Sequence, residues 1–137
     1  MSTVKVGKLR VKVPEEARVV EAYDLDEVFA CSSQRPDTLI ILEVGQKMLA
    51  VVVEDTGRPE LKDLRRLSDS IGSLKERGLV EPRMMVLKVL HHTGLKSGRS
   101  ILVELARRFR VELQECHHTP IDLDQILRKR GMLLRIR

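Results

Sequence analysis

The sequence predicts an α/β fold built around a mixed β-sheet, and three observations lead to this class. Apolar, β-branched runs flank the pair Gly45-Gln46 as the strands of a hairpin do. The segments after residue 59 alternate between helix-like and strand-like periodicity. Strands joined through a helix are expected to be parallel neighbours. We therefore expect a central antiparallel hairpin, flanking helices and a parallel β-α-β-α C-terminal half.

The composition sets bounds on the class of protein. The chain has 137 residues, of which 42% are apolar and 33% charged, so we expect one globular domain over residues 1–137. No apolar run is long enough to span a bilayer, and residues 1–10 lack the apolar core of a signal peptide, so we expect a cytoplasmic protein with no membrane partner. Dense charge without asparagine is typical of thermophiles. The net charge of +5 favours an anionic partner, first of all nucleic acid.

The N-terminal third contains two segments of different character. Thr3 to Val13 alternates apolar and basic residues like a strand, with a phase slip near Gly7 that indicates a bulge or a turn. Its basic side chains fit either an edge strand protected against aggregation or a face that contacts phosphate; they are Lys5, Lys8, Arg10 and Lys12. From Pro14 to Ala30 we expect a short helix followed by a strand.

The hairpin is the segment with the most definite predicted geometry. Leu39 to Val44 and Lys47 to Val53 form its strands, and Gly45-Gln46 suits a two-residue type II′ turn. Pairing Val44 with Lys47 makes Asp37 face Glu54. Directly paired side chains share a face with Cβ atoms about 4.5–5.5 Å apart, so the two carboxylates are predicted to share one divalent cation. In the same register Arg35 faces Thr56.

The remaining elements follow from helical spacing and apolar runs. A helix is expected from Pro59 until Gly78 stops it, with Leu61, Leu64, Leu67, Ile71 and Leu74 on its apolar stripe. The later elements are a strand from Met84 to Leu90, a helix from Ser97 to Arg108, a strand from Val111 to Cys116, a helix starting at Thr119-Pro120, and a short strand from Met132 to Ile136.

The Pro-Asp pair, the hairpin and the closing acidic residue together resemble the restriction-endonuclease-like, or PD-(D/E)xK, nuclease superfamily. Asp37 matches the motif aspartate and Glu54 its second acid, while Thr56 stands where the family has a lysine. The resemblance implies a Mg²⁺ or Mn²⁺ site at Asp37 and Glu54, with Glu21 as a further acid from the segment before the hairpin. Lys62 or Arg35 would then compensate for the missing lysine.

Three functions remain open on these residues. The resemblance implies a metal-dependent nuclease acting on duplex or branched DNA, as an endo- or exodeoxyribonuclease, with weak or lost activity because of Thr56. The alternative is a catalytically inactive nucleic-acid-binding or structural subunit of a larger nuclease or repair assembly. A homodimer and a partner protein are both compatible with either function.

The third function is a metal-binding interaction domain. The pairs His91-His92 and His117-His118 each follow a predicted strand, and Cys116 precedes the second pair. If the two strands are parallel neighbours, both loops leave the sheet at the same edge. Imidazole and thiolate are zinc ligands, so this edge is the alternative metal site, although neighbouring histidines usually point in different directions.

Overall fold

The computed structural model describes residues 2–25, 37–95, 99–115 and 120–133. Its strands are β1 (Ser2–Val6), β2 (Leu9–Val13), β3 (Ala17–Asp24), β4 (Thr38–Val44), β5 (Lys47–Asp55), β6 (Met85–His92), β7 (Val111–Glu115) and β8 (Ile121–Asp122). Its helices are α2 (Leu61–Glu76), α3 (Arg99–Phe109) and α4 (Leu123–Lys129).

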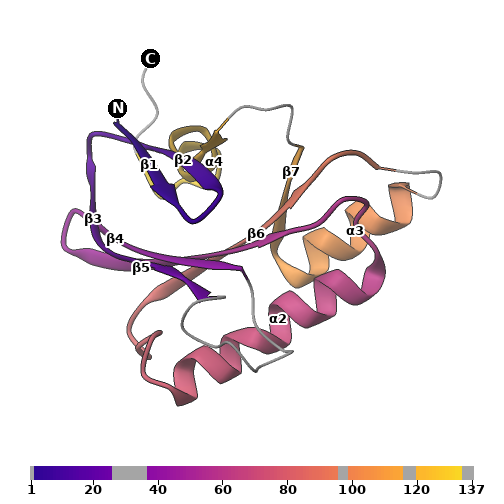
Figure 1. Cartoon of the computed structure of the whole chain (residues 1–137), viewed down its shortest axis with the longest axis horizontal. Helices are drawn as coiled ribbons and strands as arrows, with labels where there is room; N and C mark the ends of the chain where they lie inside the picture. The colour runs from indigo at the N-terminus through magenta and orange to yellow at the C-terminus, as the bar shows by residue number, and fades with distance from the viewer. Residues whose placement is uncertain (1, 26–36, 96–98, 116–119, 134–137) are drawn as a thin grey trace.

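The larger sheet is mixed, with strand order β3-β4-β5-β6-β7. β3, β4 and β5 form an antiparallel meander, and β6 and β7 continue the sheet parallel to β5. Figure 1 shows α2 and α3 on one side of this sheet. The predicted α/β class, with an antiparallel hairpin and a parallel C-terminal half in one mixed sheet, is confirmed.

Different elements cover the two faces of the sheet. On one face, Ile40, Val51 and Val89 share a core with β1, β2, β8 and α4. On the other face, Leu39 and Val52 pack with side chains of α2 and α3. β5 is therefore buried along most of its length, and its sequence is apolar from Met48 to Val53, because a strand covered on both faces has no solvent side.

The hairpin between β4 and β5 has the predicted register. Val44 pairs with Lys47, and the ladder runs in step to Thr38 paired with Val53. Gly45 has a φ of 63°, whereas Gln46 does not adopt a positive φ, as a type II′ turn requires. The turn residues and the strand pattern thus fix this part of the fold locally.

The N-terminal segment forms a second hairpin. β1 and β2 pair antiparallel with Val6 opposite Leu9, so that Gly7 and Lys8 make the turn and Gly7 has a φ of 59°. Of the two sequence alternatives, bulge or turn, the turn is correct. β8 adds parallel to β2 and completes a three-stranded sheet of order β1-β2-β8.

The helix predicted to begin near Pro14 is wrong. Residues Ala17–Asp24 form β3, which starts after a turn in which the Ala17 N–H donates to Pro14 O at 3.1 Å. β3 pairs along its whole length with β4, with one irregularity between Val19 and Glu21. Pairing with a buried strand outweighs the weak helical preference of this segment. The strand expected toward Ala30 falls largely outside the described residues.

The C-terminal predictions are corrected in part. α4 begins at Leu123 and not at Thr119-Pro120, and Asp122 is its N-cap, accepting from Gln125 N–H at 3.0 Å. Ile121–Asp122 is instead the short strand β8. Of the strand expected from Met132 to Ile136, the described residues Met132 and Leu133 are not in a strand.

α2 agrees closely with its prediction. Glu60 is the N-cap, and the Glu60 N–H donates to the Asp63 carboxylate at 2.7 Å as half of a capping box. Three stripe residues, Leu64, Leu67 and Leu74, are buried, and the helix ends before Gly78, which has a φ of 75°. α2 therefore lies in a fixed rotation against the sheet, with Asp63 on its buried side.

Candidate functional site

The candidate site lies where β4 begins and where β5 and β6 end. Thr38, the first residue of β4, pairs with Val53 of β5. Two residues later in β5, Asp55 pairs with His91 of the neighbouring strand β6. The ends of neighbouring strands thus bring residues from three segments to one end of the sheet. In mixed α/β sheets the carboxyl ends of parallel strands are the usual place for ligands.

Asp37 is held one residue out of step with the hairpin ladder. Its N–H donates to Val53 O at 3.0 Å, although Thr38 is the residue paired with Val53. Asp37 precedes β4 (Thr38–Val44), and its N–H turns back to the carbonyl of the residue that is already paired with Thr38. Asp37 therefore does not continue the ladder to face Glu54 as predicted. It lines a pocket together with Thr38 and Val53.

Asp37 also joins the ends of three strands. Its carboxylate accepts the Asp55 N–H at 2.6 Å, and its carbonyl oxygen accepts the Leu25 N–H at 3.0 Å. These bonds tie the start of β4 to the end of β5 and to the residue after β3. Asp37 has a structural role here in addition to any chemical one.

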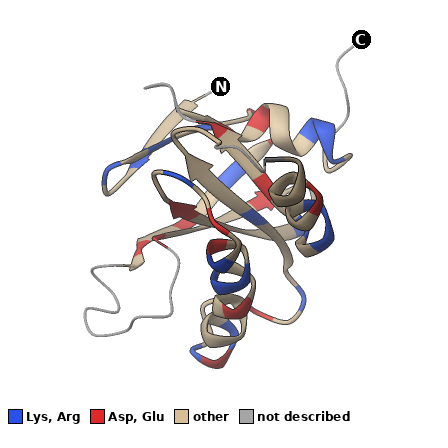
Figure 2. Ribbon diagram, turned by 90° about the vertical axis from the view of Figure 1, so that its right-hand side faces the viewer, with Lys and Arg blue, Asp and Glu red and all other residues tan. Residues whose placement is uncertain are grey.

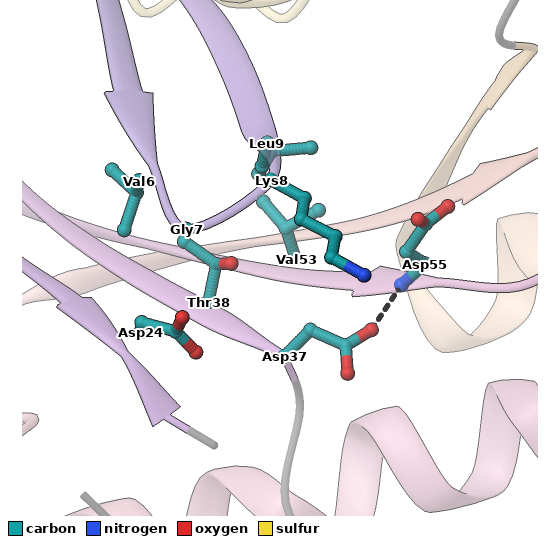
Figure 3. Close-up of a pocket in the computed structure, with 9 residues that line it drawn as sticks. All are labelled: Val6, Gly7, Lys8, Leu9, Asp24, Asp37, Thr38, Val53 and Asp55. Carbon is teal, nitrogen blue, oxygen red and sulfur yellow. Dashed lines mark hydrogen bonds between the residues drawn. The ribbon is translucent and has the colours of Figure 1, made fainter. Parts of the chain in front are cut away.

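The pocket beside Asp37 has a volume of about 320 Å³. Figure 3 shows three carboxylates around it, those of Asp24, Asp37 and Asp55, and the Lys8 side chain reaching from the β1–β2 turn toward Asp37 and Asp55. Its lining residues are Val6, Gly7, Lys8, Leu9, Asp24, Asp37, Thr38, Val53 and Asp55. Glu54 does not line it.

Glu54 lies instead against α2. The residue is 5% exposed, and one carboxylate oxygen is 2.8 Å from the Arg66 guanidinium. Arg66 also contacts Asp63 at 2.9 Å, so one guanidinium bridges two carboxylates. The second oxygen of Glu54 is buried without a hydrogen-bond partner among the described atoms.

Burial dominates the titration of Glu54. Loss of hydration raises the pKa of its carboxyl from the ordinary value of 4.5 to about 7. The Arg66 guanidinium opposes this increase, while the charges of Asp37 and Asp63 add to it. At neutral pH, Glu54 is therefore divided between its charged and neutral forms.

The other predicted site residues lie apart from Glu54. Lys62 is exposed on α2 and pairs with Glu60 at 3.3 Å, so Arg66, not Lys62, is the α2 cation that contacts Glu54. Glu21 is exposed on β3, where it accepts a hydrogen bond from the Tyr23 hydroxyl. Arg35 lies outside the described residues.

Thr56 follows β5 and presents no amine to the site. Its N–H donates to His91 O at 2.8 Å, which continues the contact between the ends of β5 and β6. The position where the resembling family has a lysine is therefore used here for backbone pairing and a neutral side chain.

The metal predicted at Asp37 and Glu54 stays a prediction, which the surroundings of the two carboxylates do not favour. Each carboxylate has a partner of its own, the Asp55 N–H for Asp37 and the Arg66 guanidinium for Glu54. In the part of the chain that the structure describes, no three His, Cys, Asp or Glu side chains lie close enough together to hold an ion. A guanidinium has no lone pair to offer and already neutralises the negative charge of Glu54.

The parallel arrangement behind the histidine prediction is confirmed, but His91 and His92 lie within β6 (Met85–His92) and not in a loop after it. β6 and β7 are parallel neighbours, with His91 opposite Gln114 and His92 opposite Glu115. His91 and His92 are both buried, and His91 Nδ1 lies 3.3 Å from a carboxylate oxygen of Asp55. Cys116, His117 and His118 lie outside the described residues, so the zinc site stays a prediction.

Four of the residues that form this end of the sheet were not among the predicted site residues. The spacing of Arg66, three positions after Asp63 on one helix, could have indicated it. Asp55 could have been found because it stands next to Glu54. No sequence pattern indicates Asp24 or Lys8, because β3 and the β1–β2 turn reach the pocket only through tertiary packing.

None of the known protein-family models, curated proteins or solved structures matches this chain. Among its described helices, none is both long enough and apolar enough to cross a membrane.

Proposed function

We propose that the chain is a nuclease-like domain with a restriction-endonuclease-like core, which binds nucleic acid and in which metal-dependent hydrolysis is weak or lost. The order of elements supports this fold. The antiparallel meander β3-β4-β5 is followed by α2 and by β6, which is parallel to β5. Asp37 stands at the start of β4 and Glu54 near the end of β5, where the resembling family has its two acids.

The ion pair between Glu54 and Arg66 is the observation that supports weak or lost activity. A hydrolytic site of this class needs carboxylates that are open to Mg²⁺ or Mn²⁺ and a lysine nearby. Glu54 is instead buried against a guanidinium at 2.8 Å. Arginine is always protonated, so it can neutralise Glu54 but cannot act as a base. Thr56 supplies no charge in its place.

Binding of nucleic acid does not depend on the ion pair. The net charge of +5 favours a polyanionic partner, and phosphate contacts from lysine and arginine supply most of non-specific affinity. Only Tyr23, Phe29 and Phe109 are aromatic, so stacking on single-stranded bases is a poor alternative. We therefore expect backbone contacts, strongly dependent on salt.

One observation favours retained activity as a second candidate. Three carboxylates and the Lys8 side chain surround the pocket beside Asp37. Carboxylates with a lysine are the residue types of a phosphodiesterase site. In this second candidate, Asp55 would take the role that the sequence assigned to Glu54, and Lys8 the role assigned to Lys62.

A cleavage assay separates the two candidates. The protein is incubated with supercoiled plasmid, single-stranded DNA and a four-way junction, each with Mg²⁺ or with Mn²⁺. We expect no more than traces of cleavage, unchanged in Asp55→Ala. Robust cleavage abolished by Asp37→Ala and Asp55→Ala, and retained in Glu54→Gln, would establish the second candidate. Robust cleavage that Glu54→Gln abolishes would contradict the role given to Arg66.

A further inference from the structure

The two-stranded ribbon β1–β2 has one apolar and one basic face. Val4, Val6, Val11 and Val13 turn inward and belong to or pack on the core above the large sheet. The opposite face carries lysine and arginine from both strands, with Lys5 paired to Arg10 and Thr3 paired to Lys12. Lys8 stands at the turn between them. Figure 2 shows basic positions along this ribbon. We call Lys5, Lys8, Arg10 and Lys12 the basic ribbon face.

The arrangement of charges works against stability. Like charges directly opposite each other in an antiparallel pair are destabilising, and Lys5 and Arg10 occupy such a position. Lysine on an edge strand protects against aggregation, and this accounts for Lys5 on β1. It does not account for Lys12, because β2 lies between β1 and β8.

Carboxylates lie near the turn more than along the strands, because Lys8 reaches toward Asp37 and Asp55. In the described part of the chain, Lys5, Lys8 and Lys12 form no ion pair, whereas other surface cations do, such as Arg18 with Glu43 at 3.3 Å. The acidic residue paired with Lys12 is Asp122, which caps α4 through Gln125 N–H at 3.0 Å. Lys5 and Lys12 therefore present positive charge on the outer side of the ribbon.

The ribbon reaches the candidate site. Gly7 and Lys8 line the pocket beside Asp37, and Figure 3 shows the turn directly above it. The fit is close, because a Cβ on Gly7 would lie 2.5 Å from a carboxylate oxygen of Asp24. A polymer lying along the basic ribbon face would thus reach the turn residues Gly7 and Lys8 that border the pocket.

We propose that the basic ribbon face binds the sugar-phosphate backbone of nucleic acid and leads it toward the pocket beside Asp37. This inference rests on the proposed nucleic-acid role and adds the surface that performs it. Lysine and arginine contacts to phosphate release condensed counterions, so this surface governs the salt dependence of binding and carries no base sequence preference.

The test compares two triple variants that each remove three positive charges. The ribbon variant is Lys5→Gln/Lys8→Gln/Lys12→Gln. The matched control is Lys47→Gln/Lys75→Gln/Arg83→Gln, whose residues are exposed and lie away from the pocket. Binding of a fluorescein-labelled duplex is measured by anisotropy over a series of salt concentrations, and circular dichroism checks the fold.

Each phosphate contact on duplex DNA contributes about 0.9 to the slope of log K against log salt concentration. We expect the ribbon variant to lower this slope by roughly 2–3 and the affinity at low salt by about 10- to 100-fold. The control should keep the wild-type slope, and a ribbon variant with three Lys→Arg changes should keep both slope and affinity.

The possible failures can be told apart. Wild-type binding that the ribbon and control variants reduce equally would overturn the ribbon proposal and leave the nucleic-acid role intact. Wild-type protein that binds neither duplex nor branched DNA at low salt would overturn the proposed function and this inference with it. Binding to vesicles containing phosphatidylserine that only the ribbon variant loses, with no binding of nucleic acid, would assign the ribbon to a lipid surface and overturn the proposal.

Discussion

Removing the Arg66 side chain should leave the Glu54 carboxylate buried beneath α2 without its cation. With Arg66 present, the pKa of Glu54 is already raised from 4.5 to about 7 by burial, and Arg66 is the strongest group opposing that shift. A shift of this size corresponds to roughly 3 kcal/mol, at about 1.4 kcal/mol per pKa unit. Without Arg66 the pKa of Glu54 should rise further, so that the carboxyl takes up a proton at neutral pH.

The expected cost of Arg66→Ala depends on pH. Breaking a buried ion pair typically costs about 3–5 kcal/mol, and we expect about 2–4 kcal/mol at pH 8 because the Arg66 side chain is 41% exposed. At pH 5 most of Glu54 is neutral in the folded protein and does not need a cation, so the cost should be smaller. Glu54→Gln/Arg66→Ala should recover much of the loss at pH 8.

The pH dependence of the wild type has a definite sign. A carboxyl whose folded pKa is raised binds more protons in the folded state than in the unfolded state. Its penalty is absent below about pH 4.5, grows as pH rises toward about 7 and is complete above that. The unfolding free energy of the wild type should therefore fall relative to Glu54→Gln across this interval.

Urea denaturation at pH 5 and pH 8 measures both effects. Wild type, Arg66→Ala, Glu54→Gln and the double variant form a mutant cycle, and Arg65→Ala on the exposed side of α2 is the control, expected to change stability by less than about 0.5 kcal/mol. An Arg66→Ala cost that is equal at the two pH values, or unchanged in the Glu54→Gln background, would refute the assigned role of the ion pair.

Three further predictions concern Gly7, Asp37 and Thr56. Gly7→Ala should lower the free energy of unfolding by about 1–2 kcal/mol, because Gly7 has a left-handed φ of 59°. An unchanged midpoint of urea denaturation would contradict this. Asp37→Ala should cost about 1–2 kcal/mol by removing the acceptor of the Asp55 N–H, and Asp37→Asn should cost less, since it keeps an acceptor oxygen. Thr56→Lys should bring no metal-dependent plasmid cleavage while Arg66 holds Glu54, and a gain of cleavage in that single variant would show that the missing lysine alone limits activity.

Much of the fold was predictable because its signals are local. Gly45 permits the positive φ of a type II′ turn, and this turn alone sets the register from Val44–Lys47 to Thr38–Val53. Pro59 and Gly78 bracket α2, whose apolar stripe has helical spacing. The parallel arrangement of β6 and β7 follows from the helix between them. Each of these features depends on residues close together in the sequence.

The segment after Pro14 was not predictable in this way. Its local preferences are ambiguous between helix and strand. It forms β3 because it pairs with the buried strand β4, with one irregularity between Val19 and Glu21. The candidate site shows the same limit. The backbone hydrogen bond from Asp37 to Val53 ends the ladder before Asp37 faces Glu54, and no residue pattern predicts this bond.

The sequence by itself determined the β4–β5 hairpin, α2, the β6-α3-β7 unit and the presence of acidic residues at one end of the hairpin. The tertiary structure alone decided which side chains meet there. The rotation of α2 on the sheet selected Arg66 over Lys62 as the partner of Glu54, and the packing of the β1–β2 ribbon brought Lys8 to the pocket beside Asp37. Turns and caps are set by neighbouring residues, whereas contacts between distant segments depend on how whole faces pack. A shift of one residue in strand register, or of a fraction of a turn in helix rotation, changes which side chains meet.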